Sequence, residues 1–304
     1  MFPTAPFRWL AHQDIATDDD TFRIRRVYPD TLRRSIEEQG VKTPLLVVEH
    51  NGSLQLVSGW GRYRFAASDA PLPAYVLPTS TPIEELWDRH ITDNDRWNVV
   101  EAARVLERLR QLPTLDDQCI VRKKLPLLGI RPANDLFQNY LRLLRLPQVA
   151  HDFIERENLP LRRASLFAKL PATALPTFFV HADNLRWTLN EVSEVLELVA
   201  ETAEREQVSV DEILNAACTG QDKSAALTYL RQRRFPELAR YQKQLAGLMD
   251  DLNFSVPVRV EWDRRLEKPG IRLIAELDDA DALQILCREM ESQHDRLKRF
   301  FDIL

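Results

Sequence analysis

Residues 36–67 read IEEQGVKTPLLVVEHNGSLQLVSGWGRYRFAA, and this stretch gives the clearest indication of the fold of the first part of the chain. Its two short apolar runs, residues 45–49 and 54–58, flank an Asn-Gly turn at residues 51–52, a pattern that predicts a β-hairpin. The residues before Gly40 have the apolar spacing of a helix, and a second helix is expected directly after the hairpin. The stretch therefore predicts a mixed α+β domain.

The turn from the hairpin into the second helix concentrates glycine and arginine. Four of the eight glycines of the chain lie within residues 40–61, and the turn itself contains Gly59, Gly61, Arg62 and Arg64. Free backbone N–H groups at a helix start and guanidinium groups together suit an anion such as a phosphate. A purely structural turn, with the arginines paired to surface carboxylates, fits the same residues, so both interpretations stay open here.

A second polar loop precedes a helix whose N-cap is expected to be Asn98. Asp93 and Asn94 lie in this loop, and Mg²⁺ in proteins is often held by one or two such oxygen ligands together with water. An ordinary Asx turn is the alternative interpretation of the same pair. The helix itself is predicted from the apolar spacing of residues 100–109.

The chain has 304 residues, of which 44% are hydrophobic, so it can bury a sizeable core and form about two domains. Its apolar runs are short, and its first ten residues contain two prolines and an arginine. We therefore expect neither a signal peptide nor a membrane-spanning segment, and no membrane partner. The three cysteines are widely spaced and form no CxxC pair, which favours a reducing compartment, the cytoplasm, and offers no zinc-site spacing.

The net charge of −5 is unevenly distributed along the chain. Residues 101–170 carry 13 Lys and Arg against 8 Asp and Glu, whereas residues 1–100 carry 11 against 14 and residues 171–304 carry 17 against 24. A basic segment between acidic flanks can dock on phosphates while the flanks discourage indiscriminate polyanion binding. An ordinary solvated helix surface would carry the same local charge, so charge alone does not decide between the two.

The basic segment has the outline of a helix-turn-helix. A helix over residues 116–128 is expected to end at Gly129, and a second helix is predicted over residues 133–146. In this motif the start of the second helix enters the major groove of DNA. The candidate DNA-binding residues are Lys123, Lys124, Arg131, Asn134, Gln138, Asn139, Arg142 and Arg163.

Taken in order, three stretches resemble motifs of the ParB family of bacterial chromosome and plasmid partition proteins. Residues 36–67 are similar to its first motif, in which a helix ending in glycine precedes a strand, a hairpin and a Gly-x-x-Arg-x-Arg box. Residues 93–106, DNDRWNVVEAARVL, are similar to its second box, and residues 136–170, which contain NYLRLLRLP, resemble its helix-turn-helix block. The resemblance covers roughly residues 7–170, over half of the chain.

The resemblance implies a ParB-like, sequence-specific protein that binds double-stranded DNA in chromosome or plasmid partition and nucleoid organisation. Its N-terminal domain would bind CTP with Mg²⁺ and gate clamping on DNA. By position, the nucleotide-binding residues would be Gly59, Gly61, Arg62, Arg64 and Asn94, and the metal ligands Asp93 and Asn94. Trp60 and Gly61 stand where the family has Glu and Arg, and Asp93 stands where it has Glu.

Three domains are expected. They are a ParB/sulfiredoxin-like nucleotide-binding domain over residues 1–100, an all-helical helix-turn-helix domain over 101–170, and a C-terminal region over 171–304. The C-terminal region is predicted to be helical and to end in a strand-strand-helix unit, with strands over 256–262 and 271–277. So small a unit cannot bury both faces, and it must pack on the preceding helices or on a second copy, which leaves a homodimer open.

The resemblance also implies a ParA-type ATPase as a partner and a nucleoid-associated location. The enzymatic activity that the resemblance raises is weak hydrolysis of CTP. The sequence assigns no catalytic residues to this activity. Two alternatives stay open: a transcription regulator with a degenerate nucleotide pocket, and a small-molecule kinase of ParB/sulfiredoxin fold. A sulfiredoxin itself would need a cysteine beside the Gly-x-x-Arg box, whereas the first cysteine of this chain is Cys119.

Overall fold

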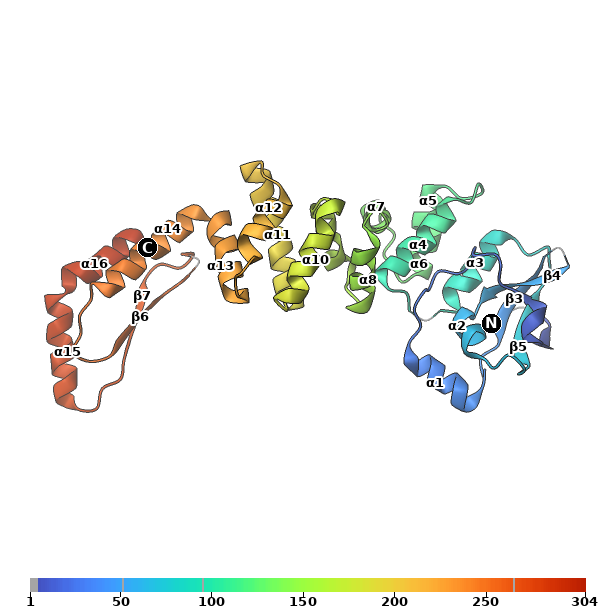
Figure 1. Ribbon diagram of the computed structural model, residues 1–304, viewed down its shortest axis with the longest axis horizontal. Helices are drawn as coiled ribbons and strands as arrows, with labels where there is room; N and C mark the ends of the chain where they lie inside the picture. The colour runs from blue at the N-terminus through green and yellow to red at the C-terminus, as the bar shows by residue number, and fades with distance from the viewer. Residues whose placement is uncertain (1–4, 51, 95, 265) are drawn as a thin grey trace. The chain divides into compact units, whose positions relative to one another are not determined.

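The computed structural model describes residues 5–50, 52–94, 96–264 and 266–304. Asn51, at the predicted hairpin turn, therefore lies outside the described residues. The chain divides into two compact units, Met1–Pro176 and Thr177–Leu304. Figure 1 labels the helices and strands of both units. The first unit contains the residues of every predicted nucleotide, metal and DNA contact.

A five-stranded mixed sheet forms the N-terminal part of the first unit. Its strands, in order across the sheet, are β1 (Phe7–Leu10), β5 (Leu72–Leu77), β3 (Leu45–His50), β4 (Ser53–Ser58) and β2 (Ile15–Ala16). β3 and β4 pair antiparallel, with His50 opposite Ser53, so the predicted hairpin is confirmed. β3 also pairs in parallel with β5, while β1 runs antiparallel to β5 and β2 runs parallel to β4.

Helices make up most of the rest of the first unit. The α-helices are α1 (Asp30–Gln39), α2 (Trp60–Phe65), α3 (Ile83–Thr92), α4 (Val99–Arg110), α5 (Asp117–Cys119), α6 (Leu125–Leu127), α7 (Asn134–Leu143), α8 (Gln148–Arg156) and α9 (Leu161–Ala164). A π-helical turn, η2 (Ile120–Lys124), joins α5 to α6, and the 3₁₀ turns are η1 (His12–Asp14), η3 (Ser165–Lys169) and η4 (Ala172–Ala174). α1 ends as predicted at Gly40, whose φ of 68° favours glycine.

β3 is buried on both faces, which explains its unbroken apolar sequence. All four residues over 45–48 are buried, and alternate side chains of a strand point to opposite faces. Leu45 and Val47 enter the core that contains Trp60, whereas Leu46 and Val48 enter the core shared with α3 and α4. A strand without polar alternation is typical of a sheet that is covered on both sides.

One hydrophobic core joins the sheet to the helices that follow residue 100. It contains Val48 and Val57 of the sheet, Trp87 of α3, Leu106 of α4 and Phe137 of α7. The segments 1–100 and 101–170 therefore share buried apolar surface within one compact unit. The functional division of the chain into three domains stays a prediction.

The second unit is helical and ends in a hairpin with two further helices. Its helices are α10 (Leu175–Asn184), which begins at the end of the first unit, α11 (Leu189–Glu206), α12 (Val210–Cys218), α13 (Lys223–Arg234), α14 (Pro236–Asp250), α15 (Ala280–Ser292) and α16 (His294–Ile303). β6 (Val258–Trp262) and β7 (Ile271–Ala275) pair antiparallel, so the second predicted hairpin is also confirmed. None of the described helices is long and apolar enough to cross a membrane.

The predicted single helix at the end of the chain is two helices. The break falls at Gln293, whose buried side chain exchanges hydrogen bonds of 2.9 and 2.5 Å with the backbone N–H and C=O of Asn253. The inner face of the hairpin packs within the unit, where Val260 joins Leu245 of α14 and Phe300 of α16 in a small core. Of the two packing alternatives for this face, the structure shows the intramolecular one.

Candidate functional site

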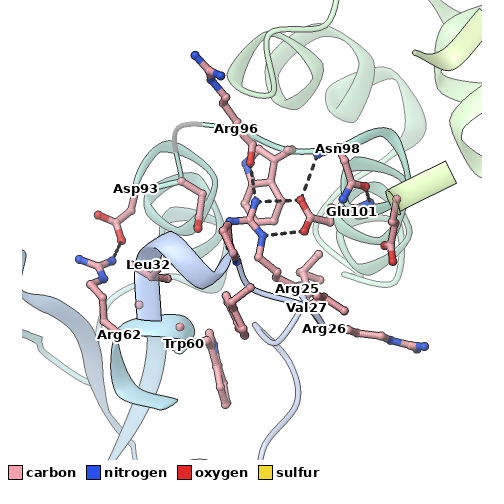
Figure 2. A pocket seen from close by; sticks show the side chains of 18 of the residues that line it. Arg25, Arg26, Val27, Leu32, Trp60, Arg62, Asp93, Arg96, Asn98 and Glu101 are labelled. Carbon is pink, nitrogen blue, oxygen red and sulfur yellow. Dashed lines mark hydrogen bonds and ion pairs between the residues drawn. The ribbon is translucent and has the colours of Figure 1, made fainter. Parts of the chain in front are cut away.

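A cleft with a volume of about 1070 Å³ lies in the first unit. Its walls come from the segment 22–29, the start of α2, the end of α3, the start of α4, and α8 (Figure 2). The arginines that line it are Arg25, Arg26, Arg62, Arg96 and Arg156. It also brings together most of the predicted nucleotide and metal residues, namely Gly59, Gly61, Arg62, Asp93 and Asn94.

Two glycines shape the cleft wall at α2. Gly59 has a φ of 98°, and a Cβ atom there would lie 2.5 Å from Cδ2 of Leu45. Gly61 lets α2 approach α1 closely, because a Cβ atom would lie 2.7 Å from Cδ1 of Tyr28 and 2.8 Å from Cδ2 of Leu32. The positive φ of Gly59 and the side chains packed against both positions therefore favour glycine there, independently of any ligand.

Arg62 is held in place by several acceptors at the cleft. Its Nη2 donates to Oδ2 of Asp93 at 2.6 Å, and its Nη1 donates to the carbonyl oxygens of Pro44 at 2.8 Å and Thr43 at 3.2 Å. The hydroxyl of Ser58 donates to the same Asp93 oxygen. The structure thus joins Arg62, predicted to hold phosphate, and Asp93, predicted to hold metal, in one largely buried ion pair (Figure 2).

Arg64 lies apart from this arrangement. Its side chain is exposed, and its guanidinium carbon lies 5.9 Å from the centre of the Phe65 ring. Arg62 and Arg64 are two positions apart on α2, and residues so spaced do not share a helix face. Of the two predicted arginines, the one that lines the cleft is Arg62.

Asp93 and Asn94 do not form a magnesium site with the residues present. Arg62 already neutralises the carboxylate of Asp93, and the side-chain amide of Asn94 donates to the carbonyl oxygen of His90 at 2.7 Å. Among residues that the structure describes, no three His, Cys, Asp or Glu side chains gather closely enough to hold a metal ion. Mg²⁺ demands octahedral oxygen ligands, so these side chains alone do not fit it.

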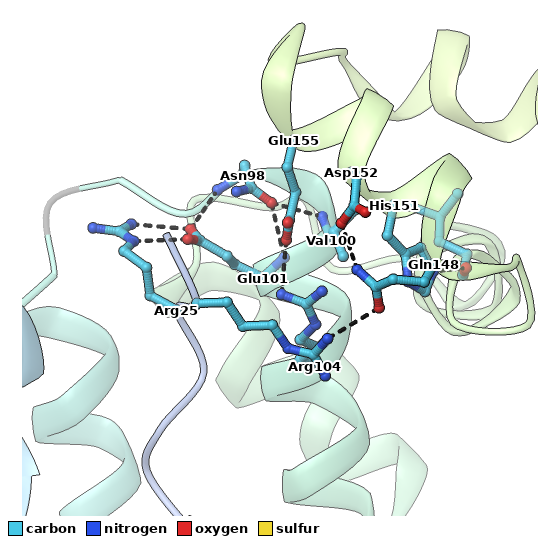
Figure 3. A network of polar contacts seen from close by, with 11 residues as sticks. Arg25, Asn98, Val100, Glu101, Arg104, Gln148, His151, Asp152 and Glu155 are labelled. Carbon is cyan, nitrogen blue, oxygen red and sulfur yellow. Dashed lines mark hydrogen bonds and ion pairs between the residues drawn. The ribbon is translucent and has the colours of Figure 1, made fainter. Parts of the chain in front are cut away.

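Arg25 makes three hydrogen bonds at the cleft, and the sequence did not predict this role. Its Nε donates to Oε1 of Glu101 at 2.7 Å, and its Nη2 donates to Oε2 of Glu101 at 2.9 Å and to the carbonyl oxygen of Arg96 at 2.6 Å (Figures 2 and 3). Hydrogen bonding to Glu101 raises the pKa of Arg25 above its usual value. The feature of the sequence that points to such a partner is Glu101, a charged residue on the apolar face of α4. In the structure Glu101 is 4% exposed.

Further polar contacts tie α8 to this wall of the cleft. Nη1 of Arg26 donates to Oε1 of Gln148 on α8 at 3.0 Å. Arg104 of α4 pairs with Glu155 of α8 at 2.7 Å, and both side chains are largely buried (Figure 3). The segment 22–29 is therefore fastened to both α4 and α8.

The outline of the predicted helix-turn-helix is present as α6, a turn, and α7. Gly129 in the turn has a φ of 71°, and the amide of Ile130 donates to the carbonyl oxygen of Leu125 at 3.0 Å. α7 buries Phe137 and Leu143 and turns a polar face outward. The helix is shorter than predicted, since regular α-helix stops at Leu143.

The predicted DNA-binding residues differ in their exposure. Those exposed are Lys123, Arg131, Asn134, Gln138 and Arg142, and those half-buried are Asn139 and Arg163. Lys124 instead is 3% exposed, and its Nζ pairs with Oδ1 of Asp88 on α3 at 2.5 Å. Because the side chain points inward and its charge is paired, the structure does not present Lys124 to a DNA phosphate.

Comparison with known proteins gives only distant similarity. No protein-family model matches the chain, and no curated protein matches its sequence. The chain is similar in structure to C-terminally truncated chromosome-partitioning protein ParB from Caulobacter crescentus, complexed to the centromeric parS site, with 16% identity and a TM-score of 0.38, covering 62% of this chain and 98% of that one. The same protein complexed with CTP-γ-S gives 22% identity and a TM-score of 0.25, with 57% and 98% covered.

Proposed function

We propose that this protein is a ParB-like, sequence-specific DNA-binding protein that acts in chromosome or plasmid partition and nucleoid organisation. The observation that carries the proposal is the outward face of α7, where Asn134, Gln138 and Arg142 are exposed directly after a tight turn. Asn and Gln side chains can pair with the edge of adenine in the major groove, and Arg with guanine. The exposed Lys123 and Arg131 lie just before this helix and suit phosphate contacts.

Salt dependence and base preference test the proposal separately. If Lys123 neutralises a phosphate, Lys123→Ala should reduce the slope of log affinity against log salt by about 0.9 and leave base preference unchanged. Gln138→Ala should relax base preference at one position of the site, because that side chain would read a base edge. The probe is a duplex recovered by selection from a randomised pool, and binding is followed by fluorescence anisotropy at several salt concentrations.

A matched control is Lys298→Ala, which removes one exposed positive charge from the second unit. This variant should keep the wild-type slope of log affinity against log salt and the wild-type base preference. Salt-independent binding, or failure of the selection to enrich any sequence, would contradict the DNA-binding function. Mapping on the genome then separates partition, with one cluster of sites near the origin, from the alternative of a transcription regulator with sites scattered over promoters.

We infer that the cleft binds a nucleoside triphosphate, CTP, and that this gates clamping on DNA. Arg62 supports this inference, because it places a guanidinium group at the cleft, and guanidinium groups form strong charge-assisted hydrogen bonds to phosphate. A triphosphate would compete with Asp93 for Arg62. Mg²⁺ is expected only together with the triphosphate, whose oxygens would add the ligands that Asp93 and Asn94 cannot supply alone.

Calorimetry with the four ribonucleoside triphosphates tests the nucleotide site. Hydrogen bonds to charged groups are worth about 1.5–3 kcal/mol, so Arg62→Ala should weaken CTP binding at least about tenfold. Arg33→Ala is the matched control, since Arg33 is an exposed arginine of α1 that pairs with Glu37. Removing Mg²⁺ with a chelator should weaken binding to the wild type. Absence of CTP binding, with and without DNA, would favour the regulator with a degenerate pocket.

The remaining parts of the proposal are a homodimer, a ParA-type ATPase partner and weak CTP hydrolysis. Weak CTP hydrolysis is tested by measuring the release of phosphate from CTP. The wild type and Arg62→Ala are compared, each with and without selected DNA. A small-molecule kinase is the less favoured alternative, because it would not require the polar face of α7.

A further inference from the structure

The outer strand of the five-stranded sheet, β1, carries two exposed aromatic side chains. Phe7 is 48% exposed and Trp9 is 61% exposed, and they share a face because side chains two positions apart in a strand point the same way. Their rings meet edge to face, with ring centres 5.7 Å apart. Tyr75 of β5 lies directly opposite Phe7, with ring centres 5.9 Å apart. Phe7, Trp9 and Tyr75 therefore form an aromatic row at this edge of the sheet.

The open edge of β1 also presents backbone groups for hydrogen bonding. The amide of Val76 in β5 donates to the carbonyl oxygen of Pro6 at 3.0 Å, so Pro6 and Val76 form a hydrogen-bonded pair. Such pairs alternate along antiparallel strands, so the backbone groups of Arg8 face β5, whereas those of Phe7 and Trp9 point away from the sheet. Within the described part of the chain, no hydrogen bond reaches these outward N–H and C=O groups.

β1 has little of the protection that natural edge strands usually have. Such edges are commonly blunted by charges, prolines, bulges or a covering helix, because unpaired backbone groups attract other strands. The one charge of β1, Arg8, lies on the face opposite to the aromatic row, and the nitrogen of Pro6 faces β5 rather than the outer edge. An open edge with an aromatic row suits strand addition, in which backbone hydrogen bonds give affinity and side chains give specificity.

Arg8 determines which kind of strand can pair with this edge. Its ion pair with Glu49, at 3.5 Å, joins two half-exposed side chains and is therefore weak. A second copy of this chain could pair with both Phe7 and Trp9 only by placing its own Arg8 directly opposite, and like charges so placed destabilise a sheet. A carboxylate at that position would be attracted instead. Charge complementarity therefore favours a segment of another protein, with an acidic residue between two apolar ones.

We propose that β1 binds an extended segment of another protein, with the pattern apolar–acidic–apolar, as an additional antiparallel strand of the sheet. Its apolar residues lie opposite Phe7 and Trp9 and exchange backbone hydrogen bonds with them, and its acidic residue lies opposite Arg8. None of the β1 residues lines the cleft. This interaction surface is thus additional to the proposed nucleotide and DNA sites and depends on neither.

Selection of random seven-residue peptides against the full chain tests which sequences bind. We expect enrichment of peptides in which an acidic residue has an apolar residue on each side. An enriched peptide is then labelled with a fluorophore and titrated by anisotropy. N-methylation of its two apolar residues should weaken binding at least about fivefold, because it removes two backbone hydrogen bonds to β1.

An exchange of charges tests the position of Arg8. Arg8→Glu should weaken binding of the selected peptide about two- to fivefold, and a peptide with Lys in place of its acidic residue should recover that loss in this variant alone. The recovered binding also shows that the variant is folded. Trp9→Ala should weaken binding to a similar extent. Arg34→Glu, at an exposed arginine of α1, is the matched control and should keep the wild-type affinity.

Failure to enrich any peptide, or an affinity that is unchanged in both Arg8→Glu and Trp9→Ala, overturns the inference. A lower mass of Trp9→Ala in light scattering would also overturn it, because β1 would then be a contact between copies of this chain. If oligothymidine binds through Trp9 and the peptides do not, the aromatic row belongs to a site for single-stranded nucleic acid, and the inference is wrong. Each of these outcomes leaves the proposed function as it stands.

Discussion

At the scale of single residues, His90 shows how burial fixes a protonation state in the cleft wall. Its side chain lies among aromatic rings, with ring centres 5.7 Å from Phe22 and 5.3 Å from Trp97. Its Nδ1 lies 2.7 Å from the carbonyl oxygen of Val57, which can only accept, so Nδ1 carries the proton. Burial lowers the pKa of His90 to about 4, and the ring is therefore neutral at physiological pH.

This pKa predicts how the stability of the protein depends on pH. The folded-state pKa lies below the unfolded value of 6.5, so the unfolded state binds more protons at His90 as the pH falls below 6.5, and stability falls with it. One such proton changes the free energy of unfolding by up to about 1.4 kcal/mol per pH unit. His90→Gln, which keeps an N–H donor for Val57, should lose this part of the pH dependence between pH 6.5 and pH 5.

Urea unfolding of both proteins at a series of pH values measures the effect. His181→Gln is the control, since His181 is less buried and hydrogen-bonded to Asn215, and it should keep the wild-type slope. Parallel curves for wild type and His90→Gln would show that His90 titrates at an ordinary pKa.

At the scale of elements, the start of α4 combines helix capping with tertiary anchoring. Oδ1 of Asn98 accepts from the amides of Val100 at 3.0 Å and Glu101 at 2.9 Å, and Oε2 of Glu101 accepts from the Asn98 amide at 3.1 Å. The same carboxylate pairs with Arg25 (Figure 3). Glu101 thus fixes where the helix begins and which segment packs against it.

Loss of this cap should destabilise the first unit. Asn98→Ala removes the acceptor for two otherwise unpaired amides, and it should lower the free energy of unfolding by about 1 kcal/mol, within the range 0.5–2 kcal/mol. Asn98→Asp keeps an acceptor at the N-cap and should stay close to the wild type. Denaturant midpoints of the three proteins check this, and equal midpoints for Asn98→Ala and the wild type would mean that the cap contributes no stability.

At the scale of the whole molecule, the second unit leaves apolar side chains uncovered. Those exposed in its hairpin and last two helices are Ile274, Leu283, Ile285 and Phe301, from 38% to 57%. The inner face of the hairpin is already packed on α14 and α16. A homodimer would therefore use the exposed side chains rather than the inner face.

Light scattering on the full chain at micromolar concentration should give the mass of a dimer. Phe301→Lys should shift the mass toward that of a monomer, because it places a charge among apolar contacts. Phe7→Lys, at an exposed aromatic residue of β1 in the first unit, is the control and should remain dimeric. A monomer mass for the wild type would rule out the homodimer in the free protein.

The sequence alone determined the features that depend on neighbours in the chain. The hairpin of β3 and β4, the end of α1 at Gly40 and the N-cap of α4 at Asn98 all follow from turn and capping chemistry within a few residues. The α+β class follows from the order of these elements. Such contacts are local, so a residue pattern carries them before any tertiary packing exists.

The partners of the charged side chains follow from tertiary packing and not from the residue pattern. Arg62 and Asp93 are 31 positions apart, Lys124 and Asp88 are 36 apart, and Arg25 and Glu101 are 76 apart. An arginine or lysine on a helix is by default solvated, and whether it reaches DNA, a nucleotide or a buried carboxylate depends on which distant element packs beside it. For that reason Lys124 was expected on the DNA surface, whereas folding buried it against α3.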